Sequence, residues 1–148
     1  MSDRIEKTIE LKAPIERVWR ALTDHNEFGE WFRVKLDGPF VLGEVSTGRI
    51  TYPGYEHIKW NATIKQMEAP RLFSFRWPHE GIEPEADGSQ ETTTLVEFRL
   101  EPTSNGTRLT IVESGFDALP ADRRAEAFRS NEGGWKEQMK NIQAHVEH

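Results

Sequence analysis

The chain has no cysteine, no cluster of basic residues and no long apolar run. Without cysteine it forms no disulfide and offers neither a thiolate nucleophile nor a sulfur ligand for a metal, which suits a reducing compartment. Its net charge of -6 argues against nucleic acid as a partner, because phosphates are bound mainly by basic side chains. No stretch approaches the roughly 18 apolar residues of a membrane span, and the N-terminus lacks the apolar core of a signal peptide. We therefore expect a cytoplasmic protein without a membrane span.

Motifs for metal, cofactor and nucleophile chemistry are also missing. The histidines, at positions 25, 57, 79, 145 and 148, never recur at ligand spacing with an acidic companion, so we expect no metal site and no cofactor. Ser114 lacks the preceding glycine of a nucleophile elbow and a nearby histidine to activate it. The sequence thus indicates no catalytic residue and favours binding over catalysis.

The chain does contain many large aromatic residues. Its 148 residues are the size of one domain, and a domain of this length buries roughly 70% of the surface that its extended chain exposes. The hydrophobic fraction is only 36%, but the 5 tryptophans and 8 phenylalanines supply apolar surface that a disordered chain lacks. We expect residues 1–148 to form a single domain with one core.

Two helical patterns lie near the ends of the chain. Apolar and polar residues alternate over 5–11, which is typical of a strand, and Pro14 then favours the start of a helix. A short helix is predicted over 14–22 and a second over 24–32. Near the C-terminus an apolar helical stripe recurs at steps of seven, four, three and four, formed by Phe128, Trp135, Met139, Ile142 and Val146.

Between these helices the chain is typical of strands separated by turns. Residues 103–106 predict a hairpin turn, and the acidic segment 79–91, with its glycines and prolines, predicts a mobile loop. Short strands joined by short turns imply an antiparallel sheet, and the terminal helix is the only element long enough to cover one face of it. The predicted fold is α+β, a curved antiparallel sheet wrapped around a long C-terminal helix, with two short helices after the first strand. The expected strands span about 32–42, 45–52, 56–68, 71–78, 92–101 and 107–113.

Several segments, in this order, resemble the heat-shock protein 90 ATPase activator homologue family of the START-like, or SRPBCC, superfamily. They are residues 13–19, Trp31-Phe32, 69–75, 106–111 with 114–116, and Gly133-Gly134-Trp135. The resemblance runs over essentially the whole chain. It implies the helix-grip fold, with a cavity between the sheet and the C-terminal helix.

The resemblance leaves the function open. The superfamily includes carriers of lipids and other hydrophobic ligands, aromatase and cyclase enzymes, and co-chaperone domains, so a shared fold does not choose among them. The eukaryotic co-chaperones also carry a separate N-terminal domain that contributes to chaperone contact. We expect 148 residues to hold only the single C-terminal domain.

Strand periodicity places aromatic side chains on faces that would meet the C-terminal helix. Such a wall suits a flat apolar ligand, since ring stacking contributes roughly 0.5 to 1.5 kcal/mol per pair beyond area burial. The alternative is that the rings fill the interior themselves; the family resemblance favours a cavity. The candidate ligand-binding residues are Trp31, Trp60, Phe73, Phe75, Trp77, Phe98, Glu113, Phe116, Phe128, Trp135 and Met139.

Glu113 is the most informative polar residue among these. Alternation places it on the same side as Leu109 and Ile111, where a carboxylate without a partner is costly. Burial there would raise its pKa and suit it to act as a general acid or base, or to hold a ligand hydroxyl. We prefer the simpler interpretation that the strand ends near Glu113 and its side chain reaches water or an arginine, with Arg49 and Arg76 as candidate partners.

The leading hypothesis is non-enzymatic binding of a small hydrophobic molecule, aromatic or lipid-like, between the sheet and the C-terminal helix. Segments 79–91 and 116–125 would act as its gate. Two alternatives stay open. One is a protein-interaction module with a chaperone as its partner, and the other is a cyclase-like enzyme for a polyketide-like substrate, with Glu113 as its acid or base.

Overall fold

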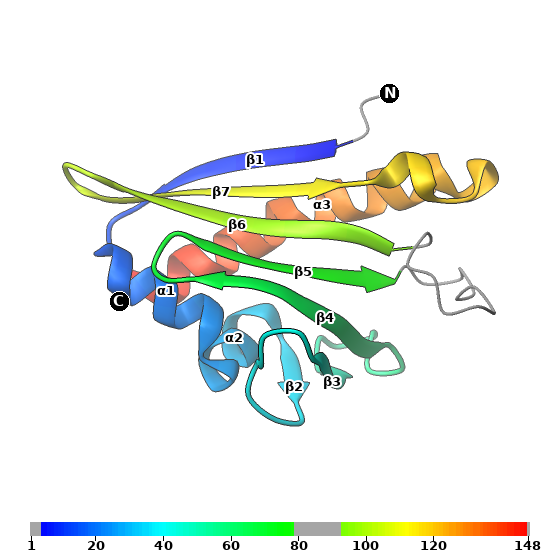
Figure 1. The fold of residues 1–148 in the computed structure, drawn as a ribbon, viewed down its shortest axis with the longest axis horizontal. Coiled ribbons are helices and arrows are strands. Elements are labelled where there is room, and N and C mark those ends of the chain that lie inside the picture. The colour runs from blue at the N-terminus through cyan, green and yellow to red at the C-terminus, as the bar shows by residue number, and fades with distance from the viewer. Residues whose placement is uncertain (1–3, 79–92, 148) are drawn as a thin grey trace.

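The computed structural model describes residues 4–78 and 93–147, which form a curved sheet over one long helix (Figure 1). Two short helices follow the first strand, as the sequence predicts. The elements in chain order are β1 (Arg4–Leu11), α1 (Ile15–Thr23), α2 (His25–Phe32), β2 (Val34–Leu36), β3 (Val45–Ile50), β4 (Lys59–Glu68), β5 (Leu72–Pro78), β6 (Thr93–Thr103), β7 (Gly106–Ser114), the 3-10 turn η1 (Phe116–Ala118) and α3 (Ala121–Val146).

The sheet has seven strands in the order β1-β7-β6-β5-β4-β3-β2, and every neighbouring pair is antiparallel. The hairpin predicted at 103–106 joins β6 to β7, with Thr103 paired to Gly106 across the turn. The register shifts between Ile64 and Gln66 on β4, and such a bulge bends a strand. β1 pairs with β7, which places the first strand at one edge of the sheet.

The helix α3 lies against the concave face of the sheet, and α1 and α2 lie at the end of the sheet near the C-terminus (Figure 1). The sheet can curve around α3 because α3 presents one apolar stripe, with Trp135, Met139, Ile142 and Val146 buried. This is the helix-grip arrangement, so the predicted fold class is confirmed.

Local signals in the sequence explain where the two short helices begin. Pro14 stands at the N-cap of α1, where its missing N–H costs nothing. The Asp24 carboxylate caps α2 by accepting from the backbone N–H groups of Asn26, at 2.9 Å, and Glu27, at 3.1 Å. The helix α2 then ends at Arg33, which adopts the left-handed conformation with φ 69°. The predictions over 14–22 and 24–32 are therefore confirmed.

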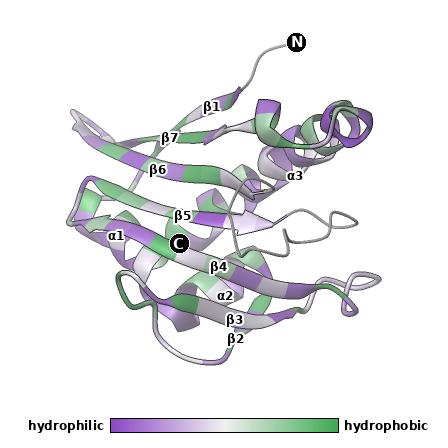
Figure 2. Ribbon diagram, turned by 45° about the vertical axis from the view of Figure 1, so that its right-hand side comes forward, coloured by the Kyte–Doolittle hydropathy of each residue, from purple (hydrophilic) through white to green (hydrophobic). Residues whose placement is uncertain are grey.

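The strand faces also follow the predicted alternation. On β6, Thr94, Val96, Phe98 and Leu100 are buried, and hydrophobic and hydrophilic residues alternate along the strand (Figure 2). The same inward face continues on the neighbouring strands. Its other buried members are Trp60, Ala62 and Ile64 on β4 and Phe73 and Phe75 on β5.

One sequence prediction about the backbone is wrong. The strand expected over 32–42 is reduced to β2, because Phe32 closes α2 and Pro39, which has no N–H, interrupts the ladder after Asp37-Gly38. At Gly133 and Gly134, a Cβ built on either residue meets nothing within 4 Å, and α3 continues through both. The loop predicted at 79–91 lies outside the described residues.

No helix in the described part of the chain is both long enough and apolar enough to cross a membrane.

Candidate functional site

Aromatic rings from α2, β4, β5, β6 and α3 meet between the sheet and the helices. Trp60 contacts Phe75, with ring centroids 5.4 Å apart, and Phe98 contacts Trp135 at 5.7 Å. The rings therefore fill the centre of the interior, which was the alternative to a central cavity. Space for a guest lies at the edge of this aromatic cluster. Its further members include Phe28, Trp31, Phe32, Phe40, Phe73 and Trp77.

At that edge Trp77 of β5 stacks on Trp135 of α3, with centroids 5.5 Å apart and planes inclined by 21°. Phe32 lies 6.2 Å from each of them. Beside the stacked indoles is a pocket of about 100 Å³. It is lined by Phe32, Trp77, Asn131, Gly134, Trp135 and Gln138.

Glu113 of β7 lies directly behind this pair and is fully buried, with 0% of its surface exposed. The expectation that its side chain reaches water is therefore wrong. Trp77 Nε1 donates to Oε2 at 2.8 Å and Trp135 Nε1 donates to Oε1 at 2.8 Å. Asn131 Nδ2 donates to both oxygens, at 2.9 and 3.0 Å, and the Thr94 hydroxyl also donates to Oε2. We call these five residues the Glu113 network.

The geometry of the sheet and the helix explains why these residues meet. Trp77 on β5 pairs with Thr94 on β6, and Glu113 pairs with Val96, two residues further along β6. Asn131 and Trp135 are four residues apart on α3 and so share one face of the helix. All four side chains donate to the carboxylate. The network thus joins three strands to the helix through one carboxylate.

The remaining predicted site residues lie in other surroundings. Phe116 and Phe128 contact each other at 5.1 Å, and neither lines the pocket. Met139 is 8% exposed and belongs to the core. Arg76, offered as a partner of Glu113, donates instead to Thr93 Oγ1 at 3.3 Å.

The segment 116–125, predicted as part of a gate, is regular structure formed by η1 and the start of α3. The Arg124 guanidinium donates to three backbone carbonyls in it, those of Phe116 at 3.2 Å, Asp117 at 2.8 Å and Leu119 at 3.2 Å. The segment is therefore anchored to the helix rather than an open loop.

Sequence reasoning missed four residues that line the pocket, namely Phe32, Asn131, Gly134 and Gln138. The signal for two of them was present. Asn131 and Gln138 stand at helical spacing from Trp135, inside the apolar stripe, where a polar side chain needs a buried partner. Gln138 Nε2 donates to the Phe32 carbonyl at 3.0 Å.

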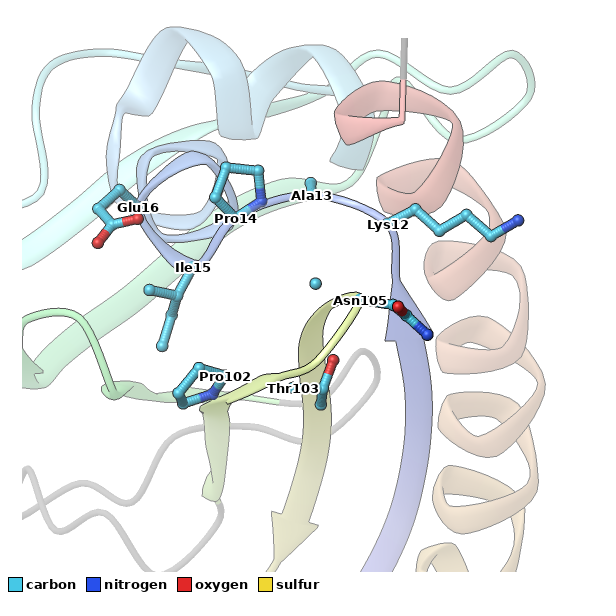
Figure 3. A pocket seen from close by; sticks show the side chains of 9 residues that line it. Lys12, Ala13, Pro14, Ile15, Glu16, Pro102, Thr103 and Asn105 are labelled. Carbon is cyan, nitrogen blue, oxygen red and sulfur yellow. The ribbon is translucent and has the colours of Figure 1, made fainter.

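A larger depression of about 460 Å³ lies at the opposite end of the sheet, between the turn after β1 and the β6–β7 hairpin (Figure 3). Ile15 points toward Pro102 across it, while Lys12 and Glu16 extend away in opposite directions (Figure 3). The Thr107 hydroxyl nearby is already bonded to the Ala13 carbonyl at 2.8 Å. The polar residues that line this depression are Lys12, Glu16, Thr103 and Asn105.

A charged cluster lies at the C-terminal end of α3. Glu27 of α2 accepts from Arg17 at 2.6 Å and from Arg20 at 2.7 Å, and His145 Nε2 lies 2.9 Å from its Oε1. Burial raises the pKa of Glu27, but hydrogen bonds from His145, Arg17 and Arg20 outweigh burial, so the pKa lies below its ordinary value. The cluster joins α1, α2 and α3. Among the described residues, no three acidic or histidine side chains are grouped in a way that could hold a metal ion.

Comparison with solved structures shows the same fold. A protein of the dynemicin biosynthetic locus, DynU16, has a TM-score of 0.78 at 20% identity, covering 99% of this chain and 48% of that one, so this chain spans about half its length. Protein MLL2253 from Mesorhizobium loti has a TM-score of 0.76 at 22% identity, covering 97% and 96% of the two chains. The Aha1 dimer from Colwellia psychrerythraea has a TM-score of 0.72 at 19% identity, covering 97% and 96%.

At these identities the structural likeness shows the fold alone. A search of the curated proteins finds no match. The profile of one protein family, however, matches residues 12–147, which is most of the chain. The chain therefore belongs to the family described as Activator of Hsp90 ATPase homolog 1-like protein, with the helix-grip fold of START-like, or SRPBCC, proteins.

Proposed function

We propose that this protein binds a small, flat apolar molecule, without transforming it, in the pocket beside Trp77 and Trp135. The observation that carries the proposal is that these stacked indoles donate both of their N–H groups to the same carboxylate, Glu113. The rings are held in place before a guest arrives, so little conformational freedom is lost on binding. Aromatic walls with few polar groups are typical of small-molecule sites.

The residues around the pocket favour binding over catalysis. The six residues that line it include two tryptophans, one phenylalanine, two side-chain amides and one glycine, and none of them titrates or acts as a nucleophile. The Glu113 oxygens behind them already accept from four side chains. A general acid or base needs an oxygen that reaches the substrate, so this arrangement supports a structural role for Glu113.

The size of the pocket limits its guest. Pockets for drug-sized ligands measure about 300–1,000 Å³, and the present pocket measures about 100 Å³. A cavity of roughly 150 Å³ is enough for benzene. A benzene-sized guest, and still more a bicyclic one, therefore requires α3 to move outward near Gly134, where the helix is exposed.

The two neighbouring glycines of α3 supply a matched test. Gly134 lines the pocket and Gly133 does not, and a Cβ added to either meets nothing within 4 Å. Both alanine variants should fold, since alanine favours a helix over glycine by about 1 kcal/mol. Isothermal titration calorimetry with 1-methylnaphthalene should show saturable binding, weakened about tenfold by Gly134→Ala, because overpacking costs about 1–3 kcal/mol. Gly133→Ala should change the affinity less than about twofold.

Two results would count against the proposal. Absence of saturable binding for both 1-methylnaphthalene and benzene would remove it. Equal affinities of the Gly133→Ala and Gly134→Ala variants would place any binding at another site.

A second candidate function is contact with a chaperone, which the family description suggests. Its support is a set of exposed apolar side chains at the start of β3 and on the two segments beside it, namely Val41, Leu42, Val45, Tyr52 and Tyr55, each between 48% and 59% exposed. Apolar side chains of this kind are enriched in protein interfaces when they gather in one patch. A chaperone ATPase assay with added protein tests this candidate. Stimulation that Leu42→Ser and Tyr55→Ser abolish would support it, and an unchanged rate with the unmodified protein would exclude it.

A further inference from the structure

The side-chain amide of Asn131 has a defined orientation, and this bears on what the pocket can recognise. Its nitrogen lies 2.9 and 3.0 Å from the two Glu113 oxygens. A carboxylate facing a side-chain amide at these distances accepts from the NH₂ group and does not approach the amide oxygen. The Asn131 Oδ1 atom therefore points away from Glu113. Asn131 itself lines the pocket, and among the described residues no group donates to its Oδ1.

The other polar groups of the pocket wall are already engaged. The N–H groups of Trp77 and Trp135 donate to Glu113. Gln138 donates to the Phe32 carbonyl at 3.0 Å and accepts from Asn141 at 3.0 Å. A guest therefore meets ring faces, the Asn131 amide oxygen and the Gln138 amide, one N–H of which donates to the Phe32 carbonyl.

We propose that the ligand of this pocket is a flat apolar molecule that carries a hydrogen-bond donor, an amine or a hydroxyl, and that Asn131 Oδ1 accepts from that donor. The inference rests on the proposed function and narrows its ligand class. A carboxylate or phosphate on the ligand would face the negative end of the Asn131 carbonyl, with the Glu113 carboxylate behind it. A protonated amine gains in addition from the faces of the two indoles. Asn131 is thus a specificity-determining residue.

A series of probes that share one ring tests the inference on the intact protein. The probes are 1-naphthylmethylamine, 1-naphthalenemethanol, 1-methylnaphthalene and 1-naphthoate, measured by isothermal titration calorimetry near neutral pH. The amine and the alcohol should bind at least about tenfold more tightly than naphthoate, and more tightly than 1-methylnaphthalene, because a polar group placed without a partner loses affinity.

The outcomes separate this inference from the proposed function. If naphthoate binds as tightly as the amine, or more tightly, the donor requirement is overturned while ligand binding stands. If none of the four probes binds, nor benzene, the proposed function fails and the inference fails with it.

A pair of asparagine variants on the same helix locates the acceptor. Asn131→Ala should reduce the advantage of the alcohol over 1-methylnaphthalene to less than about twofold, because the accepting oxygen is gone. Asn141→Ala removes an amide that bonds to Gln138 outside the pocket lining, and it should keep that advantage. An advantage that persists in Asn131→Ala would overturn the assignment to this residue. Should Asn131→Ala fail to fold, the probe series with the unmodified protein decides.

Discussion

The two halves of α3 are held to the protein in different ways. Trp135, Met139, Ile142 and Val146, all in the half from 135 to 146, are buried against the sheet and the short helices. None of residues 121–134, all of which the structure describes, is buried. That first half makes polar contacts through Asn131 on Glu113 and Arg124 on the η1 carbonyls, and its Phe128 packs on Phe116. Full apolar burial thus anchors the second half, whereas the first half combines directed hydrogen bonds with partly buried apolar contacts.

The difference indicates where the molecule can open. Segments with few buried apolar contacts open locally at a lower free-energy cost than core elements do. Gly133 and Gly134, which disfavour helix by about 1 kcal/mol each relative to alanine, lie in the first half, next to the pocket. We therefore expect the first half to move when a guest enters, while the second half stays in place.

Truncating the anchored half should have the largest effect on stability. Ile142 is 0% exposed. Ile142→Ala should lower the free energy of unfolding by about 2–5 kcal/mol, because it removes buried methyl groups and leaves a cavity, and Ile142→Val by about 0.5–1.5 kcal/mol. Urea unfolding measures both. A loss below about 1 kcal/mol for Ile142→Ala would contradict the assignment of this half as the anchor.

Disturbing the Glu113 network should have a smaller effect. Glu113→Gln preserves the shape of the side chain but replaces one accepting oxygen with an NH₂ group, which then faces donors from Trp77, Asn131 or Trp135. A buried donor without an acceptor costs about 1–3 kcal/mol, so the free energy of unfolding should fall by that amount. Hydrogen exchange should show the loosening chiefly in residues 121–134. Faster exchange confined to the second half would reverse the comparison between the two halves.

Much of the fold follows from patterns that one sequence displays. Alternation identified the inward face of β6, and the step pattern through Trp135 and Ile142 identified the buried side of α3. The same alternation placed Glu113 inward. The strand predicted over 32–42 persists only as Val34–Leu36, because Pro39 has no N–H to continue the ladder.

The hydrogen-bond partners of Glu113 could not be predicted from one sequence, for a physical reason. Its partners Asn131, Trp135 and Trp77 are 18, 22 and 36 residues away along the chain. Periodicity states which way a side chain points, but it does not state which donor from another element arrives beside it. Whether rings leave a cavity is likewise decided by contacts of a few ångströms across elements. Strand and helix patterns do not encode those distances.

The charged cluster at the far end of α3 should give the smallest effect, one that depends on pH. Because hydrogen bonds from His145, Arg17 and Arg20 lower the pKa of Glu27 in the folded protein, the unfolded chain takes up its proton first as the pH falls. The stabilisation is therefore fully present above the ordinary pKa of 4.5 and is lost as the pH drops through the lower folded value. Urea unfolding between about pH 6 and about pH 3 should show a steeper loss for the unmodified protein than for Glu27→Gln, which has no carboxylate to protonate there. Parallel curves would show that the cluster contributes no pH-dependent stability, and that burial alone holds the anchored half of α3.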